Sequence, residues 1–432
     1  MTGLLIAAPS SGSGKTTFTL GLLRALRNAG QDIAPAKAGP DYIDPAYHAV
    51  ASGVPCINLD PWAMRPDLIS ALASRHMEGG RTLIVEGMMG LFDGASDGTG
   101  SAADLAQHLS LPIVLVVDCA RQSHSIAALV SGFRDFRRNV MIAGLILNRV
   151  GSERHEAMLK SALKSVGIPI LGSLPKSEEL QLPERHLGLV QAGEHRDLEG
   201  FIENAGSVVS DRVDIRRVSE MAGRYGAKES MANVGRLPPM GQRIAVARDD
   251  AFAFSYVHLL EGWRRQGAGI RFFSPLADEA PAADSDAIYL PGGYPELHAG
   301  RLAAAGHFAE GIRQAANKSI PIYGECGGYM VLGQSIEDGT GKTHEMLGLL
   351  PVETSFAKRK MHLGYRRMEP LEGSPFKSAL RGHEFHYASI VREGKAERLF
   401  HVRDALGDNL GNAGLRVGSV SGSYMHVIDL VG

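Results

Sequence analysis

The sequence has few cysteines, no excess of either charge and no long apolar run. Its three cysteines, Cys56, Cys119 and Cys326, are too few for a disulfide framework, and the count fits a reducing cytoplasm. The 45 Lys and Arg residues against 47 Asp and Glu residues give a net charge of −2, which does not favour a broad nucleic-acid-binding face. The longest apolar runs, such as 111–117, are far shorter than the roughly 20 residues of a membrane-spanning helix. The N-terminus lacks the positive charge of a signal peptide and is typical of a first strand. We therefore expect no nucleic-acid and no membrane partner.

What is present is a globular composition that predicts an α/β fold. The chain has 432 residues, of which 44% are hydrophobic and 52 are glycine, which suits two or three domains rich in tight turns. Short segments of continuous hydrophobicity recur, each followed by a Gly-rich turn and a longer helical pattern, and this indicates parallel strands covered on both faces. They lie at 4–8, 82–85, 113–117, 142–147 and 168–171, and in a second series at 244–247, 288–290 and 320–323.

A polar, mixed-charge stretch separates the two series of strands. It runs from about residue 210 to 242 and ends in Pro-Pro-Met-Gly, which indicates an inter-domain linker. We expect an N-terminal domain at 1–209, a linker at 210–242 and a C-terminal domain at 243–432.

A Gly- and Ser-rich segment between the first strand and a helix has the features of a phosphate-binding loop. It reads PSSGSGKTT at 9–17 and departs from the GxxxxGK[ST] pattern in one place, since Pro9 stands where the first Gly is expected. Backbone N–H groups would wrap the phosphates, Lys15 would add a charge, and the Thr16 hydroxyl can ligate magnesium. The alternative is a turn that binds nothing. The predicted nucleotide-binding residues are Gly12, Ser13, Gly14, Lys15, Thr16 and Thr17, with Asn148, after a later strand, placed to read the base.

Two further segments bring acidic groups to the same edge of the predicted sheet. The segment KAGPDYIDP at 37–45 follows the second strand and offers Lys37 and two carboxylates on a loop stiffened by two prolines. The segment EGMMGLFDG at 86–94 places Glu86 at the C-terminal end of a strand, where open α/β sheets bind ligands. A single carboxylate on such a loop more often caps a turn or stays solvated than binds a metal or a substrate. Because these lie together near Lys15, we interpret them as metal and substrate groups.

The second half contains a cysteine on a sharp turn. The segment 322–330 has the strand, G-x-Cys-G-G and helix order of a nucleophile elbow, and we expect the helix dipole to lower the pKa of the Cys326 thiol. The N–H of Gly327 can point into an oxyanion hole, and Gly293, in the Gly-rich turn LPGGYPE at 290–296, can supply the other donor. The alternative is that Cys326 is a small buried apolar residue without a catalytic role.

A thiolate nucleophile needs a base, and His426 is the preferred candidate among 16 histidines because its flanking pattern suggests a strand end. His383 and His386 form a second group in GHEFHY at 382–387. Their spacing of three could indicate metal ligation, but no third or fourth ligand is apparent in the sequence. We favour substrate contact or structural hydrogen bonding over zinc for these two.

Six of these segments together resemble the cobyrinic acid a,c-diamide synthase family, in which a dethiobiotin-synthetase-like ATP domain is fused to a class I glutamine amidotransferase domain. The resemblance covers nearly the whole chain. It implies a P-loop NTPase-like parallel-sheet domain followed by a flavodoxin-like α/β amidotransferase domain. In one place the chain departs from triad amidotransferases, because Ile428 stands where they carry a Glu two residues after the catalytic His. The third residue of the triad is therefore not assigned. The segments are SSGSGKTT at 10–17, KAGPDYIDP at 37–45, EGMMGLFDG at 86–94, LPGGYPE at 290–296, GECGGYM at 324–330 and GHEFHY at 382–387.

The resemblance also implies a reaction. ATP and Mg²⁺ would activate a carboxylate as an acyl phosphate, and Cys326 with His426 would release ammonia from glutamine to amidate it. The acceptors would be the a and c acetates of a corrin polycarboxylate, either hydrogenobyrinic acid, which we favour, or cobyrinic acid. In this interpretation Lys15 and Lys37 neutralise phosphoryl charge, Thr16, Asp44 and Glu86 hold the metal, and Asp41, Tyr42, Asp44 and Asp93 bind or orient the substrate.

Two alternatives stay open at this point. A sirohydrochlorin a,c-diamide synthase that acts on a nickel tetrapyrrole shares the same motifs. A ParA-like ATPase switch with an inert appended domain belongs to another class, and it predicts no glutaminase activity and gives no reason for the Gly residues around Cys326. A homodimer is also left open.

Overall fold

The structure, a computed structural model, describes residues 2–185, 188–224 and 234–432. The chain forms two compact units, one of Met1–Trp62 and Pro66–Val234, the other of Ala63–Arg65 and Gly235–Gly432. The segment 210–242 contains the end of α7 (Leu198–Arg212) and all of α8 (Ile215–Arg224), and the division between the units falls within it. Residues 225–233 of that segment lie outside the described residues.

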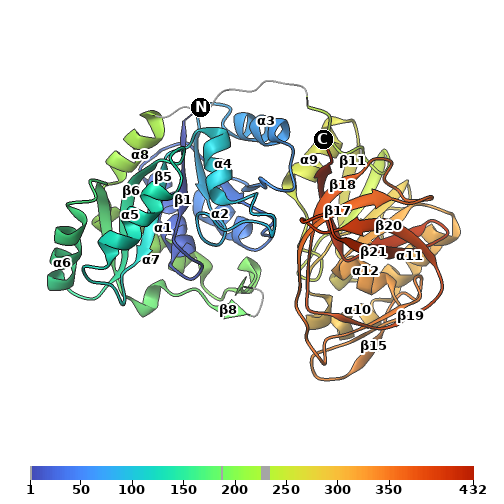
Figure 1. Ribbon diagram of the computed structural model, residues 1–432. Helices are drawn as coiled ribbons and strands as arrows, with labels where there is room; N and C mark the ends of the chain where they lie inside the picture. Colours follow the sequence, from blue (N-terminus) through green and yellow to red (C-terminus); the bar gives the residue numbers. More distant parts are fainter. Residues whose placement is uncertain (1, 186–187, 225–233) are drawn as a thin grey trace. The chain divides into compact units, whose positions relative to one another are not determined.

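The N-terminal unit is built on a parallel sheet of seven strands in the order β3-β2-β4-β1-β5-β6-β7 (Figure 1). Strands β1 and β2 are buried along their whole length, because helices cover both faces of the sheet, and this explains their continuous hydrophobicity. The strands are β1 (Gly3–Ala7), β2 (Ile33–Ala38), β3 (Ile57–Leu59), β4 (Thr82–Glu86), β5 (Ile113–Asp118), β6 (Ile142–Val150) and β7 (Ile170–Pro175), and a small hairpin joins β8 (Glu184–Arg185) to β9 (Gly188–Leu189).

The strand order places β1 between β4 and β5, so the chain leaves β1 at the point where the order of the sheet reverses. The predicted helix after β1 is present, and Gly30 follows it in a left-handed conformation with φ 74°. Among the described residues no helix combines the length and apolar character needed to cross a membrane. The helices of this unit before α7 are α1 (Lys15–Asn28), α2 (Asp44–Ser52), α3 (Pro66–His76), α4 (Ala102–Leu109), α5 (Ile126–Phe136) and α6 (Glu153–Leu163).

The C-terminal unit contains a mixed sheet of ten strands (Figure 1). The parallel part runs β11 (Gly269–Phe273), β10 (Arg243–Ala247), β12 (Ala287–Leu290), β13 (Ile322–Glu325) and β22 (Val420–Ser423). The antiparallel part continues with β21 (Asn409–Val417), β20 (Glu397–Arg403), β17 (His362–Pro370), β18 (Leu380–His386) and β23 (Met425–Leu430). Around this sheet lie α9 (Val257–Arg265), α10 (Ala299–Ala304), α11 (Gly306–Asn317), α12 (Gly327–Leu332) and a smaller sheet of β15 (Thr343–Glu345), β14 (Ser335–Glu337), β16 (Val352–Ser355) and β19 (Ser389–Glu393).

The ten-stranded sheet curls so that two distant strands meet. Strands β22, β21, β20, β17 and β18 separate β13 from β23 in the hydrogen-bonding order. Nevertheless the backbone N–H of Val427 in β23 donates a hydrogen bond to the Glu325 side chain at the end of β13, at 3.2 Å. The curvature therefore brings the start of β23 beside the turn that follows β13.

Candidate active sites

The loop after β1 has the backbone of a phosphate cradle. Gly12 and Gly14 adopt left-handed conformations with φ of 76° and 89°. The amide of Asn148, near the end of β6, donates to the Ser13 carbonyl at 2.8 Å, and a Cβ on Gly14 would lie 2.1 Å from the Asn148 Nδ2 atom. The predicted nucleotide residue Asn148 thus lies against the loop, and its contact requires a glycine at position 14.

Two side chains at the start of α1 point toward the end of β4 and the turn after it. The Lys15 amino group is buried and donates to the Met89 carbonyl at 2.7 Å, and burial lowers its pKa despite the nearby charge of Glu86. The Thr16 hydroxyl donates to Glu86 Oε1 at 2.7 Å, whereas the Thr17 hydroxyl donates to the Leu180 carbonyl at 3.2 Å. Thr16 and Glu86 therefore present two oxygen ligands side by side, close to the cation of Lys15.

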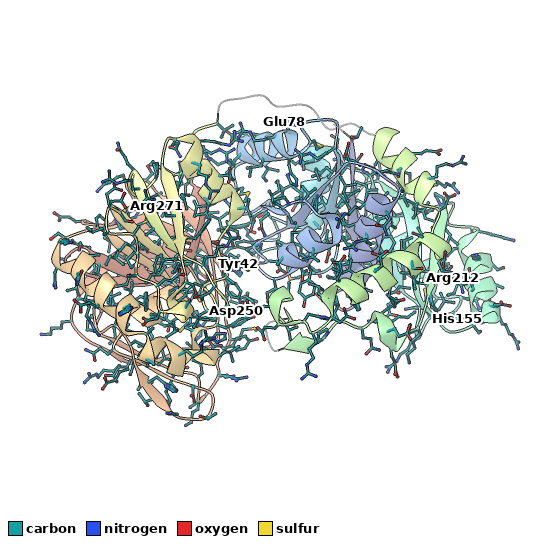
Figure 2. The ribbon with its side chains drawn as sticks, turned by 180° about the vertical axis from the view of Figure 1, so that it is seen from behind. Tyr42, Glu78, His155, Arg212, Asp250 and Arg271 are labelled. Carbon is teal, nitrogen blue, oxygen red and sulfur yellow. The ribbon has the colours of Figure 1, made fainter. Side chains whose placement is uncertain are left out.

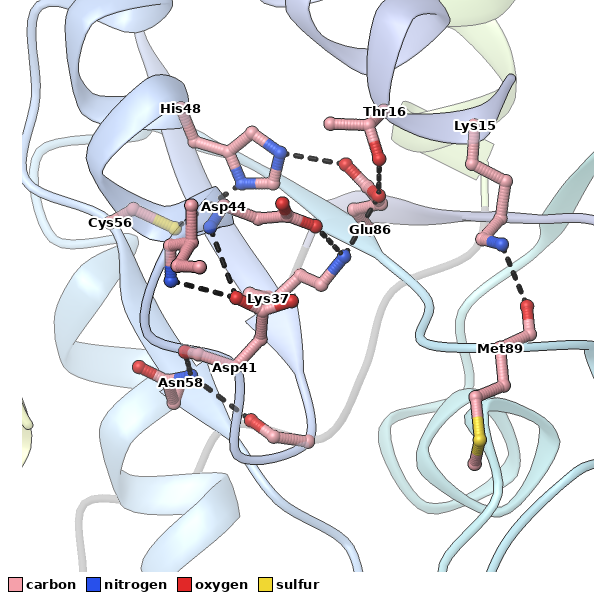
Figure 3. A network of polar contacts seen from close by, with 12 residues as sticks. Lys15, Thr16, Lys37, Asp41, Asp44, His48, Cys56, Asn58, Glu86 and Met89 are labelled. Atoms are coloured by element: carbon pink, nitrogen blue, oxygen red, sulfur yellow. Dashed lines mark hydrogen bonds and ion pairs between the residues drawn. The ribbon is translucent and has the colours of Figure 1, made fainter. Parts of the chain in front are cut away.

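Next to Thr16 lies a buried network of charged groups (Figure 3). Lys37 donates to the Asp44 carboxylate and, at 2.8 Å, to Glu86 Oε1. His48 Nε2 lies 2.7 Å from Glu86 Oε2, and His48 Nδ1 lies 3.6 Å from the Cys56 sulfur. The segment 37–45 is not one loop, as the sequence suggested, because Lys37 and Ala38 are the last residues of β2 and Asp44 begins α2. This places Lys37 and Asp44 on rigid elements.

The charges of this network compensate one another. Burial alone would lower the pKa of Lys37, but Asp44 and Glu86 outweigh it and hold that pKa above its usual range. Burial would likewise raise the pKa of Glu86, but Lys37 and His48 keep it below its usual range. Burial and the charge of Asp41 raise the pKa of Asp44 to about 6, even though Lys37 opposes them. The site thus holds Glu86 ionised and raises the pKa of Asp44 toward the neutral range.

The other predicted substrate residues lie on the turns that flank this network. Asp41 Oδ1 accepts from the N–H groups of Ile43 and Asp44, at 2.8 and 3.0 Å, and so stabilises the turn that leads into α2. Asp93 Oδ2 accepts from the Gly90 N–H at 2.9 Å within its own turn. Tyr42, labelled in Figure 2, is partly exposed on the turn before α2.

The sequence interpretation missed four groups that complete this site. His48 lies one helical turn after Asp44 on the buried face of α2, and the buried positions 44, 47, 48, 51 and 52 carry the spacing that could have found it. Cys56 contacts His48, and Asn58 donates to the carbonyls of Gly39 and Asp41 at 3.0 and 2.7 Å. The fourth group is the Met89 carbonyl, which accepts the hydrogen bond from Lys15. Met89 has a φ of 45°, and no sequence pattern predicts this conformation.

In the C-terminal unit Cys326 occupies the predicted sharp turn between β13 and α12. Its φ of 45° and ψ of −102° are strained for a residue with a side chain, and it is 3% exposed. Glycines make the turn possible, since a Cβ on Gly328 would lie 2.0 Å from the Leu290 carbonyl oxygen. A Cβ on Gly327 would lie 3.0 Å from the backbone nitrogen of Gly293, so the two predicted oxyanion donors come from adjacent backbone segments.

The imidazole of His426 shares this corner with the thiol. His426, the second residue of β23, is fully buried. A Cβ on Gly292 would lie 2.5 Å from Cε1 of His426 and 3.3 Å from Cβ of Cys326, which places both residues against the same glycine. The structure therefore brings the predicted nucleophile, base and oxyanion glycines together.

The expectation that the helix dipole lowers the pKa of the Cys326 thiol was wrong. Burial raises the pKa of Cys326, and the charge of Glu296 adds to this effect, while a hydrogen bond with the Gly327 backbone opposes it only in part. The helix that follows has just six residues, so its dipole is weak. Cys326 is thus a thiol at neutral pH, and its proton has to be removed by a neighbouring base.

His383 and His386 have different surroundings. His383 is the register partner of His426, and burial together with His426 lowers its pKa to about 3, so it is neutral. His386, Glu384 and His362 bring potential ligand atoms within 4.8 Å of one another, which adds ligands that the sequence did not reveal. However, Arg366 donates to Glu384 at 2.8 Å and already neutralises its charge. The group can therefore be satisfied without an ion.

The fold and the two sites define a class of protein, a nucleotide-binding domain joined to a glutamine amidotransferase domain. Residues 4–190 match the family model of the CobQ/CobB/MinD/ParA nucleotide binding domain, and residues 243–430 match that of the CobB/CobQ-like glutamine amidotransferase domain. A hydrogenobyrinate a,c-diamide synthase of Brucella anthropi is 69% identical over 433 residues, which cover 100% of this chain and 99% of that protein. Proteins of the same name from Sinorhizobium sp and Mesorhizobium japonicum are 60% and 48% identical and cover 100% and 98% of both chains.

The chain belongs to the hydrogenobyrinate a,c-diamide synthase family. The family resemblance of the six sequence motifs and the predicted fold class are thereby confirmed.

Proposed function

We propose that this protein uses ATP and glutamine to convert the a and c acetate groups of hydrogenobyrinic acid into amides, a step of cobalamin biosynthesis. The observation that carries the proposal is the presence, in one chain, of a phosphate cradle beside the Lys37–Glu86 network and of a thiol beside an imidazole on a nucleophile elbow. Relatives that match the whole chain and carry this activity in their name support it.

In the N-terminal unit the chemistry is activation of an acid. A substrate carboxylate oxygen attacks the γ-phosphorus of ATP, the bond to the β-phosphate oxygen breaks, and ADP leaves, which gives an acyl phosphate. The backbone of Gly12, Ser13 and Gly14 would hold the phosphates, with Asn148 bracing the loop. The Lys15 amino group would move from the Met89 carbonyl to the phosphate oxygens, and the burial of Lys15 would strengthen that interaction.

The donor set at the end of β4 fits a magnesium ion. Mg²⁺ prefers oxygen ligands, and the Thr16 hydroxyl and Glu86 Oε1 lie 2.7 Å apart beside Lys15. When bound, the ion would neutralise charge on the phosphate oxygens. Lys37 and His48 hold the Glu86 carboxylate in one orientation for this role, and Asp44, bonded to Lys37, is the third candidate ligand.

In the C-terminal unit the chemistry is release of ammonia. Cys326 Sγ attacks the side-chain amide carbon of glutamine while its proton passes to His426, and the backbone N–H groups of Gly293 and Gly327 stabilise the oxyanion. The C–N bond then breaks, His426 returns the proton to the leaving nitrogen, and water hydrolyses the thioester to glutamate. The released ammonia attacks the acyl phosphate carbon and displaces phosphate.

For the corrin substrate the proposed contacts are Asp41, Tyr42, Asp44 and Asp93. At neutral pH an ionised Asp repels a polycarboxylate, whereas a tyrosine hydroxyl can donate a hydrogen bond to it. Tyr42 can donate such a hydrogen bond to a carboxylate, and Asp44, with a pKa of about 6, can donate one only when protonated. Asp41 and Asp93 would act by fixing the turns around the substrate.

The test is the product formed with ATP, glutamine and each candidate macrocycle, identified by mass spectrometry. We expect a diamide from hydrogenobyrinic acid, and diamide formation only from cobyrinic acid or only from the nickel sirohydrochlorin would contradict the assignment. Replacing Cys326 by Ser should abolish amidation with glutamine and leave amidation with added ammonia intact. Loss of both would contradict the division of labour between the units.

Two further expectations accompany the proposal. All three cysteines are free, and a catalytic thiol has to stay reduced, so we propose the reducing cytoplasm as the site of action. A homodimer is a separate expectation, and light scattering on the purified protein tests it. A ParA-like switch would hydrolyse ATP without releasing glutamate from glutamine, so a glutaminase assay alone separates it from our proposal.

A further inference from the structure

The proposed Cys326–His426 pair has no carboxylate at the usual sequence position, because Ile428 stands there. A carboxylate from another element lies beside the imidazole instead. Oε2 of Glu325 is 3.7 Å from Nδ1 of His426, and these side chains are only 2% and 1% exposed. We propose that Glu325 positions His426 and so completes a Cys326–His426–Glu325 triad, an inference that rests on the proposed function.

The Glu325 carboxylate is fixed through both of its oxygens. The Tyr289 hydroxyl donates to Oε2 at 2.8 Å, and the Val427 N–H donates to Oε1 at 3.2 Å. Within the described residues, no Lys or Arg lies at ion-pair distance from Glu325. A buried carboxylate without a cation is costly, so the imidazolium that forms when His426 takes the thiol proton gains a stabilising partner.

The chain geometry explains how one short segment can carry both the nucleophile and the group that positions the base. Glu325 is the last residue of β13, and Cys326 follows it with the left-handed φ of the elbow, which breaks the alternation of side chains along the strand. Because Glu325 also binds the N–H of Val427, it holds the backbone of β23 next to His426 as well as the imidazole itself. Because Glu325 lies on the Nδ1 side of the imidazole, Nε2 is the nitrogen that would take the proton of Cys326 in the proposed reaction.

The neighbouring ionisable groups do not take this role. His383, beside His426 on β18, is neutral, with a pKa lowered to about 3 by burial and by His426. Glu384, the next residue, is bonded to Arg366 at 2.8 Å and to His386 at 3.1 Å. Glu325 is the carboxylate that lies beside His426, at 3.7 Å from Nδ1.

The test is the glutaminase kinetics of the full-length Glu325→Gln variant. The amide keeps the size of the side chain and removes its charge, so kcat should fall on the order of 10²-fold, less than the ~10⁴-fold measured for a serine triad because a thiol is the better nucleophile. The KM for glutamine and the rate of amidation with added ammonia should not change. The matched control is Tyr289→Phe, which removes one hydrogen bond to the same carboxylate but leaves its charge, and we expect a loss of at most about 10-fold.

The outcomes separate the inference from the proposed function. A Glu325→Gln variant with the wild-type kcat, or an equal loss in Tyr289→Phe, would overturn the positioning role. If Glu325→Gln does not fold, Glu325→Asp tests the same point, because its side chain keeps the charge but is shorter by one methylene group. A reduced kcat at unchanged KM supports the positioning role, and an unchanged kcat overturns it. Glutaminase activity that survives Cys326→Ser would instead overturn the proposed function itself.

Discussion

A methyl group added at Gly292 tests the geometry of the glutaminase site. In Gly292→Ala the new Cβ would lie 2.5 Å from Cε1 of His426 and 3.4 Å from its Nδ1. Non-bonded carbon atoms settle at about 3.5–4.0 Å, so the imidazole or the turn has to shift by about 1 Å. Neither moves freely, because His426 is fully buried and the Gly292 carbonyl accepts a hydrogen bond from Phe254 N–H at 2.9 Å. A misplacement of about 1 Å costs roughly 10²-fold in rate, which corresponds to about 2.7 kcal/mol in the activation barrier.

The assay is glutamate release by the full-length protein, with ammonia-supported amidation measured on the same preparation. We expect kcat for glutamine hydrolysis to fall roughly 10²-fold while the ammonia-supported rate is retained. Gly306→Ala is the matched control, since it adds the same methyl group in the same unit with no atom within 4 Å. A Gly292→Ala variant that hydrolyses glutamine like the wild type would refute the placement of His426 as the working base.

Three further predictions follow from other contacts. Glu86→Gln should reduce ammonia-supported amidation by about 10²-fold or more and leave glutaminase activity unchanged, because Glu86 binds Thr16, Lys37 and His48 in the other unit; ADP release measures this, and a full amidation rate would contradict it. Asn148→Ala should raise the KM for ATP about 10-fold through loss of one hydrogen bond to the phosphate loop, and an unchanged KM would show that the loop keeps its shape without Asn148. Burial lowers the pKa of His258 from 6.5 to about 4, so the unfolded chain binds a proton that the folded chain does not, and stability falls as the pH drops below 6.5. At pH 5 this amounts to about 2 kcal/mol, and urea unfolding of the C-terminal unit should show a weaker pH dependence in His258→Gln; equal pH dependence would contradict the assignment.

The sequence predicts the local parts of both sites because their signals are local. Buried parallel strands read as continuous apolar segments, and a glycine-rich turn after such a strand predicts both the phosphate loop and the Cys326 elbow. The edge of the sheet on which Lys15, Lys37 and Glu86 gather also follows, since the carboxyl ends of parallel strands share one edge.

The parts that the sequence did not predict depend on contacts between distant segments. Glu325 stands inside a motif that was recognised, but its partner Val427 is 102 residues away, and the two meet only because the ten-stranded sheet curls. The wrong expectation for the Cys326 pKa has a similar origin. Its local signal is a helix N-terminus, whereas the burial that decides the pKa comes from the packing of the whole unit.

The two sites differ in how they store charge, and this difference fits their proposed chemistry. Around Glu86 the charges are present and already paired, because Lys37 contacts both Asp44 and Glu86 and the pKa of Glu86 is held below its usual range. Around Cys326 the thiol and its neighbour His383 are neutral, and the Glu325 carboxylate faces His426 without a Lys or Arg partner among the described residues. Burial makes a thiolate at Cys326 unfavourable, and the proposed partner Glu325 would offset part of that cost by stabilising the imidazolium of His426. The backbone N–H groups of the elbow would lower the barrier further, because they stabilise the oxyanion that forms when the sulfur attacks an amide carbon.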